Sequence, residues 1–185
     1  MKNIIIVIIS YINNVFLKIS LRNTLLVEKS RFTFVKISEV LKGKNKIKIY
    51  FSSLEKSNFY VQGKKNEIDI KGALIANSKI SITGSNNRLI IAENTKIREV
   101  VINIRGNNCV IEIGENTTFG GARIVNVGID NSIHIGKNCL FSDHIEIWAS
   151  DTHSIFNDET LMINHEKPIV IEDSVWVGSR VIILK

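Results

Sequence analysis

The segment Ile113-Gly-Glu-Asn-Thr-Thr-Phe119 recurs as Ile135-Gly-Lys-Asn-Cys-Leu-Phe141 and, further along the chain, as Ile171-Glu-Asp-Ser-Val-Trp-Val177. The first two copies begin 22 residues apart, whereas the third begins 36 residues after the second. The extra residues fall in a polar stretch, 148–167, which contains Asp151 and His153. A regular repeat that is interrupted once predicts a repetitive scaffold from which a single loop projects.

The same repeat extends towards the N-terminus in a weaker form. Period-two alternation of apolar and polar residues marks short strands, as in 67–70 and 132–135. A fixed period of 21–22 residues built on short strands predicts a solenoid whose coils stack in register. Two columns of residues follow this period, the isoleucines Ile49, Ile70, Ile91, Ile113 and Ile135 and the glycines Gly63, Gly84, Gly106 and Gly128.

Within each coil a six-residue step is also present, for example from Ile135 to Phe141 to Ile147. One short strand and one turn occupy six residues, so three such faces close a triangular prism. This step favours an all-β fold, the left-handed parallel β-helix, with an extruded loop near 148–167. The 22-residue period alone is also compatible with a right-handed β-helix, and projecting it forward places the corner at which the loop departs at Ser150.

The N-terminal segment is expected to differ from the repeats. Apolar residues of 3–19 fall at helical spacing and favour a short amphipathic helix, although the β-branched run 4–9 leaves a strand as an alternative. Such a helix would cover the open end of the coil stack or lie on a membrane surface. We therefore expect two regions, a lead-in and capping segment over 1–42 and the β-helix over 43–185.

Composition and charge restrict the functional classes. The chain has 185 residues and a net charge of +6, and residues 1–50 contain ten Lys or Arg against two Glu. That basic segment allows peripheral contact with anionic lipid or acidic glycan, but a solvated surface explains it equally well. Cys109 and Cys139 have no metal or redox spacing, 3–19 is a poor signal peptide, and no nucleic-acid module is found. We expect a cytoplasmic protein, with the inner face of the membrane as an open alternative.

The hexapeptide pattern Ile-Gly-x-Asn-x-x-Phe resembles that of the left-handed β-helix acyltransferases. Over the last third of the chain, two motifs resemble the active-site half of bacterial sugar and polysaccharide O-acetyltransferases, namely 150–155 (SDTHSI) and 175–183 (VWVGSRVII). The resemblance implies transfer of an acetyl group from acetyl-CoA to a sugar hydroxyl of a bacterial surface polysaccharide or its precursor. It also implies general-base catalysis without an acyl-enzyme, no metal, and a homotrimer with active sites between adjacent prisms.

The candidate site residues follow from this resemblance and from the interrupted repeat. His153 lies three residues beyond the departure point of the loop, and a neutral imidazole there can take the proton of the attacking hydroxyl. Asp151 is a candidate to orient the ring, and the backbone amide of Ser179 is implied as the oxyanion donor. Gly178 would allow close approach of the thioester. Outward-facing side chains would complete the site: Trp176 beside the pantetheine arm or the sugar, and Trp148 and Glu146 towards the acceptor.

Two other functional classes remain open at this point. A γ-type carbonic anhydrase shares the fold and would need three zinc ligands from His134, His144, His153 and His165. A non-catalytic β-helix that binds glycans or has a structural role is the third possibility. Family members normally continue through one or two further coils, so we expect the chain, which stops in mid-coil, to be truncated at its C-terminus. The acceptor sugar and the choice between O- and N-acetylation are not determined by the sequence.

Overall fold

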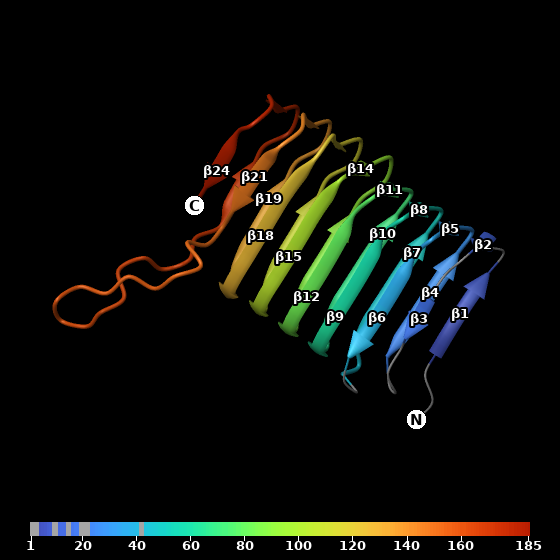
Figure 1. Ribbon diagram of the computed structural model, residues 1–185, viewed down its shortest axis with the longest axis horizontal. Coiled ribbons are helices and arrows are strands. Elements are labelled where there is room, and N and C mark those ends of the chain that lie inside the picture. Colours follow the sequence, from blue (N-terminus) through green and yellow to red (C-terminus); the bar gives the residue numbers. More distant parts are fainter. Residues whose placement is uncertain (1–3, 9–10, 14–15, 19–22, 41–42) are drawn as a thin grey trace.

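The computed structural model describes residues 4–8, 11–13, 16–18, 23–40 and 43–185, and these form one stack of three-sided coils (Figure 1). Consecutive strands lie on different faces, and each strand pairs in parallel with the strand one coil away. The described residues contain no helix, and none forms a helix that could cross a membrane. The architecture is the left-handed parallel β-helix that the six-residue step predicts.

Within the described residues each of the three faces is a sheet of eight parallel strands. The first sheet contains β1 (Ile4–Ile8), β4 (Thr24–Glu28), β7 (Lys46–Tyr50), β10 (Glu67–Lys71), β13 (Arg88–Ile91), β16 (Val110–Ile113), β19 (Ser132–Ile135) and β22 (Ile169–Ile171). The second contains β2 (Tyr11–Asn13), β5 (Arg31–Thr33), β8 (Ser53–Glu55), β11 (Leu74–Ala76), β14 (Lys96–Arg98), β17 (Thr118–Phe119), β20 (Leu140–Phe141) and β23 (Trp176–Val177). The third contains β3 (Phe16–Lys18), β6 (Lys36–Val40), β9 (Asn58–Lys64), β12 (Lys79–Ser85), β15 (Val100–Asn107), β18 (Ala122–Ile129), β21 (Ile145–Trp148) and β24 (Ile182–Leu184).

The core consists of columns of apolar side chains that run along the axis of the prism. The isoleucine column from Ile49 to Ile135 is confirmed, because its members pair in register and are buried. On the second sheet, the rings of Phe119 and Phe141 stack with their centroids 4.4 Å apart. Each fully buried side chain of this size contributes about 1.5–3 kcal/mol to folding, and the column repeats that contribution in every coil.

Polar columns fix the corners between the faces. At the corner between the third and first sheets, the side-chain oxygen of Asn66 accepts from the N–H of Asn87 at 3.0 Å, and its amide donates to the carbonyl of Gly84 at 2.9 Å. Gly84 itself has φ +115°, and a Cβ there would lie 1.8 Å from the carbonyl oxygen of Gly106. The predicted glycine column is therefore a requirement of close coil packing.

The extruded loop is confirmed, and it leaves the prism at Ser150, because Ala149 and Ser150 are buried and Asp151 is exposed. Phe119 pairs with Phe141, a step of 22, whereas Ala122 pairs with Ile145, a step of 23. The extra residue lies in the turn before β21, where His144 has φ +55°. The step on the third sheet is therefore 23 residues at this coil, because this turn is one residue longer than the turn below it.

The expected N-terminal helix is not found in the described part of its segment. Residues 4–8, 11–13 and 16–18 are the strands β1, β2 and β3, and β1 pairs with β4 in parallel. The strand alternative is correct for these residues, because β-branched side chains favour a strand that extends an existing sheet. The remaining positions of 3–19 lie outside the described residues, and strands on both sides of residue 42 belong to the same three sheets.

Candidate active site

The loop between β21 and β22 projects from the last coils of the prism, as the orange trace in Figure 1 shows. Its stem is closed by a polar network rather than by a sheet. The Ser150 hydroxyl donates to Oε1 of Glu166 at 2.8 Å and accepts from the N–H of Thr152 at 2.9 Å. Near the tip, Phe156 and Met162 form an isolated antiparallel bridge. The outgoing and returning segments of the loop are therefore held together at both ends.

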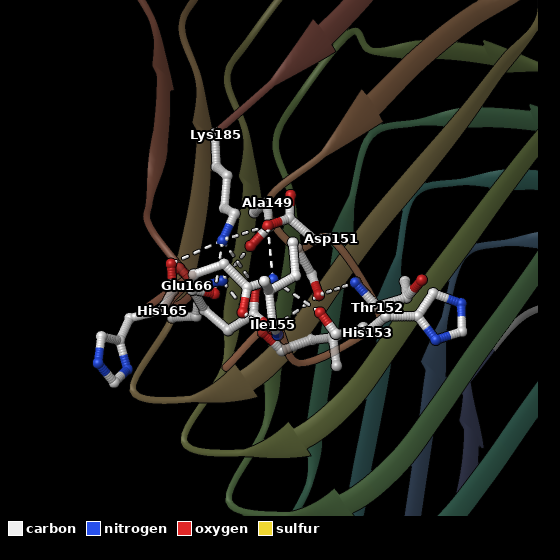
Figure 2. Close-up of polar contacts among 12 residues, drawn as sticks. Ala149, Asp151, Thr152, His153, Ile155, His165, Glu166 and Lys185 are labelled. Atoms are coloured by element: carbon white, nitrogen blue, oxygen red, sulfur yellow. Dashed lines mark hydrogen bonds and ion pairs between the residues drawn. The ribbon is translucent and has the colours of Figure 1, made fainter. Parts of the chain in front are cut away.

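Lys185, which follows β24 in the next coil, occupies the centre of this stem (Figure 2). Its Nζ lies 3.0 Å from Oδ2 of Asp151 and donates to the carbonyls of Asn164 and His165 at 2.9 and 2.7 Å. The side-chain amide of Asn164 also donates to Oδ2 of Asp151, at 2.9 Å. The Lys185 ammonium, and to a lesser extent Asn164, hold the pKa of the Asp151 carboxyl below its ordinary value.

The imidazole of His153 points away from this network and is exposed (Figure 2). Within the part of the chain that the structure describes, its ring makes no hydrogen bond. The Asp151 carboxylate is instead bonded to Asn164 and Lys185. The predicted role of Asp151 as an orienting partner therefore stays a prediction, and in this structure Asp151 reaches His153 only through Asn164.

His153 and Thr152 line a groove of about 600 Å³ on the outer face of the third sheet. We call this the outer groove. Residues of β12, β15, β18 and β21 form its floor and walls, with Trp148 on the strand that leads into the loop. The other polar side chains that line it are Ser81, Thr83, Asn103, Arg105 and Arg123. A proton acceptor thus lies beside hydrogen-bonding and cationic groups that could hold a polar, anionic chain.

Trp148 and Glu146 both face outward on β21, as alternation predicts, because Ile145 and Ile147 are buried. The indole N–H of Trp148 donates to Oε2 of Glu146 at 2.7 Å. This bond fixes the ring on the wall of the outer groove. Glu146 itself lines a neighbouring hollow of about 300 Å³ with Asp143 and His144.

The residues predicted to bind the acyl donor, Trp176, Gly178 and Ser179, lie at a different corner of the prism. In the turn between β23 and β24, the Ser179 hydroxyl donates to Oδ1 of Asp143 and lies 2.9 Å from the Ser142 hydroxyl. Donation by Ser179, and then by Ser142, holds the pKa of the Asp143 carboxyl below its ordinary value. A Cβ at Gly178 would meet no atom within 4 Å, and Trp176 is 74% exposed above Leu140. The turn is thus hydrogen-bonded to the preceding coil through Ser179, and it has open space on its outer side at Gly178.

A single chain does not bring these two groups together. The His153 loop leaves the corner between the third and first sheets, whereas Gly178 and Ser179 form the corner between the second and third sheets. The outer groove and the Ser179 turn therefore lie on two edges of the same prism.

The remaining histidines lie apart from one another. His134 is on β19 beside Glu112, His144 lies in the turn before β21, and the ring of His165 points to the opposite side of the loop stem from His153 (Figure 2). Among the described residues, no three His, Cys, Asp or Glu side chains are grouped so that they could hold a metal ion. Within one chain, the described histidines are thus not grouped as the three ligands of a zinc site. Cys109 and Cys139 are buried and unpaired by disulfides, and burial raises the pKa of the Cys109 thiol.

Sequence reasoning missed Arg105, Arg123, Asn164 and Lys185. The two arginines could have been found from the outward-facing positions of four strands, β9, β12, β15 and β18, where basic residues occur without acidic ones. These four strands include Lys64, Lys79, Arg105 and Arg123 but no Asp or Glu. Placing them side by side requires the coil register, which aligns strands that are 21–23 residues apart.

No protein-family model matches the chain. The polysialic acid O-acetyltransferase of Neisseria meningitidis is 31% identical over 144 residues, which cover 76% of this chain and 66% of that protein. The solved structure of the polysialic acid O-acetyltransferase OatWY superimposes with a TM-score of 0.73 at 29% identity, over 83% of this chain and 71% of that one. The polySia-specific acetyltransferase NeuO gives a TM-score of 0.53 at 21% identity, over 98% and 69%, and supports the fold alone.

The match to the Neisseria protein thus spans slightly less than two thirds of that relative's length. By sequence similarity, by superposition and by its three-sided coil stack, the chain is similar to the polysialic acid O-acetyltransferases and has the left-handed β-helix fold.

Proposed function

We propose that the protein is an acetyl-CoA-dependent O-acetyltransferase that acts on a sugar hydroxyl of an acidic bacterial surface polysaccharide or its precursor. The observation that supports this most directly is the position of the His153 ring beside Trp148 in the outer groove. The names of the relatives, polysialic acid O-acetyltransferases, agree with this reaction and with an anionic acceptor.

His153 is the general base in this proposal. Its exposed ring makes no hydrogen bond to the described residues, so a ring nitrogen is free to accept the proton of an incoming hydroxyl. The deprotonating oxygen attacks the thioester carbon, the C–S bond breaks, and the thiol of CoA leaves with the proton that the base received. No serine or cysteine nucleophile is needed. The Ser179 hydroxyl is bonded to Asp143, and Cys109 and Cys139 are buried.

The cations of the outer groove favour an acidic acceptor. Arg105 and Arg123 project from neighbouring strands of a face whose four central strands contain no carboxylate. Guanidinium groups bind carboxylates through paired, charge-assisted hydrogen bonds, and an extended polymer can follow the groove from one strand to the next. Trp148 offers a ring face and Asn103 an amide to the same groove.

The acyl donor is proposed to bind at the Ser179 turn of a neighbouring copy. Acetyl-CoA would supply the activated acetyl group, with the Ser179 amide at the developing oxyanion and Trp176 along the pantetheine arm. The open space at Gly178 accommodates a close approach of this kind. Because the turn and the His153 loop lie on separate corners, we propose a homotrimer in which adjacent prisms complete the site. Sedimentation should give the mass of three chains.

We further propose that the reaction takes place in the cytoplasm, where acetyl-CoA is available, with peripheral contact to the inner membrane face through the basic N-terminal segment. The test of the function is to incubate the protein with acetyl-CoA and an α-linked sialic acid polymer. Free thiol should be released, and NMR of the product should show an acetyl ester on a sugar hydroxyl. A neutral dextran of similar length serves as the control acceptor. Thiol release without an ester on any glycan would contradict the proposal.

A further inference from the structure

We propose that Lys185, Asp151 and Asn164 form a latch that positions His153 over the outer groove, with Lys185 as the central positioning residue. The effect of the latch on turnover rests on the proposed function, whereas its effect on the stability of the loop does not. None of the three residues touches the space in which a substrate would react. They act through the backbone of the loop.

Lys185 joins both sides of the loop stem to the coil that follows it. The side chain is only 9% exposed, and its Nζ contacts Asp151 on the outgoing side and the carbonyls of Asn164 and His165 on the returning side. Oε2 of Glu166 lies 4.0 Å away. The Lys185 N–H also donates to the carbonyl of Trp148 at 3.2 Å. A lysine in this position links the groove wall, the outgoing strand and the returning strand.

Asn164 carries this connection to His153. Its side-chain amide donates both to Oδ2 of Asp151 and, at 2.7 Å, to the carbonyl oxygen of His153. Its side-chain oxygen accepts from the N–H of Ile155 at 2.6 Å. The backbone from the His153 carbonyl to the Ile155 N–H is therefore fixed by one amide group, which is itself oriented by Asp151 and Lys185.

The chemistry of the network explains why a lysine is required. An ammonium has three donors and no acceptor, and here it is surrounded by two carbonyls and two carboxylates. Removing it takes this donor away from the carbonyls of Asn164 and His165 and leaves the Asp151 carboxylate with Asn164 as its remaining donor, which costs stability at the stem. The stem can relieve that cost by opening towards water. Opening would release the His153 backbone from Asn164.

The experiment compares Lys185→Ala with Lys167→Ala in the full chain. Lys167 is an exposed lysine of the same loop that forms no ion pair with a described residue. Hydrogen exchange is followed at the amides of Thr152, Ile155 and Ile163, each of which donates a hydrogen bond in the loop. We expect exchange at these amides to rise at least about tenfold in Lys185→Ala and to stay at the wild-type rate in Lys167→Ala. Amides of β19 report whether the coils remain folded.

Three further variants separate a latch from a merely structural lysine. Asp151→Asn should raise exchange at the same amides, Lys185→Arg should restore much of the protection, and the Asp151→Asn, Lys185→Ala double variant should exchange no faster than Lys185→Ala. With acetyl transfer as a second readout, Lys185→Ala should lower kcat by about 10- to 100-fold and leave KM for acetyl-CoA within about twofold. Wild-type exchange at Thr152 and Ile155 in Lys185→Ala or in Asp151→Asn would overturn the proposal. If the wild-type protein transfers no acetyl group, the proposed function fails, but the exchange comparison still decides the latch.

Discussion

The guanidinium carbon of Arg123 lies 4.8 Å from the centroid of the Trp148 ring, on the outer face of two neighbouring strands. One face of the indole is therefore covered by a cation, and the ring edge is held by Glu146. A cation–π contact at an exposed site contributes about 0.5–1 kcal/mol, enough to keep the ring in one orientation. The arrangement presents a fixed aromatic wall beside His153.

Replacing Trp148 by Ala should weaken binding of the acceptor. We expect KM for the acidic glycan to rise about tenfold, which corresponds to roughly 1.4 kcal/mol, while KM for acetyl-CoA stays the same. Trp148→Phe keeps a ring face without the indole N–H and should lose about half of that effect or less. Equal KM values for the glycan in Trp148→Ala and wild type would remove this residue from the acceptor site.

Arg105 gives a sharper test of acceptor charge, because Arg98 offers a matched control. Arg98 is exposed on β14, which belongs to the second sheet and lies away from the outer groove. Arg105→Ala should raise KM for the acidic glycan about tenfold and weaken its dependence on salt, because one charge-assisted contact is lost. Arg98→Ala should match the wild type in both properties. Steady-state kinetics at two salt concentrations checks this, and an equal loss in both variants would point to net charge instead of a groove.

Cys109 interrupts the asparagine column at the loop corner, and repairing the column should stabilise the fold. The side-chain oxygen of Asn87 accepts from the N–H of Cys109 at 3.0 Å, but the thiol offers no oxygen to Asn131 in the next coil. Asn at position 109 could accept from Asn131 and donate to the carbonyl of Gly128, which now receives only the thiol at 3.3 Å.

Because a buried hydrogen bond contributes about 1 kcal/mol, we expect Cys109→Asn to raise the melting temperature by about 2–4 °C. Calorimetry measures the change, and Cys109→Ala, which also removes the thiol but adds no amide, should lower the melting temperature. A Cys109→Asn protein that melts below the Cys109→Ala protein would show that the corner cannot accept the larger side chain.

These columns show why so much of the scaffold could be predicted from the sequence. In a solenoid the neighbours of a residue lie one coil away, so a fixed period of about 22 residues gives both the pairing partner and the face. The period places Ile135 correctly, whereas Trp176, 36 residues after its partner Leu140, is placed by the third copy of the repeated cassette. A fixed period did not predict the residue gained in the turn before β21. The expected helix was wrong at 4–8, 11–13 and 16–18, where the helical spacing of isoleucines competed with their β propensity.

The latch could not be predicted in the same way. Lys185, Asp151 and Asn164 meet because a non-repeating loop folds back on its own stem, and no period relates their positions. Arg105 and Trp148 lie two coils apart, so their common groove follows only from the observed register. The two sequence motifs likewise do not show that His153 and the Ser179 turn lie at different corners of the prism.

The pH dependence of the loop follows from the Asp151 carboxylate, which faces Lys185 and Asn164. Its pKa is lower in the folded protein than in an unfolded chain, so its contribution to loop stability is complete above the ordinary carboxyl range, near pH 4. That contribution is lost only as the pH falls through the lowered pKa. We expect the hydrogen-exchange protection of the Thr152 and Ile155 amides, corrected for the intrinsic pH dependence of exchange, to be constant from about pH 7 to 5 and to fall below about pH 4. In Lys185→Ala this protection should already be reduced at pH 7, and a loss of protection in the wild type between pH 7 and 5 would contradict the assignment.

The most direct test of the central claim, that His153 in the outer groove is the base for acetyl transfer, is the turnover of His153→Ala compared with His165→Ala. Both variants remove a loop imidazole, but the ring of His165 points to the other side of the stem (Figure 2). Removal of a general base costs about 10²- to 10⁴-fold, so His153→Ala should lose at least a hundredfold in kcat with unchanged melting, and His165→Ala should keep wild-type turnover. A folded His153→Ala protein that forms the sugar ester at the wild-type rate would contradict the claim.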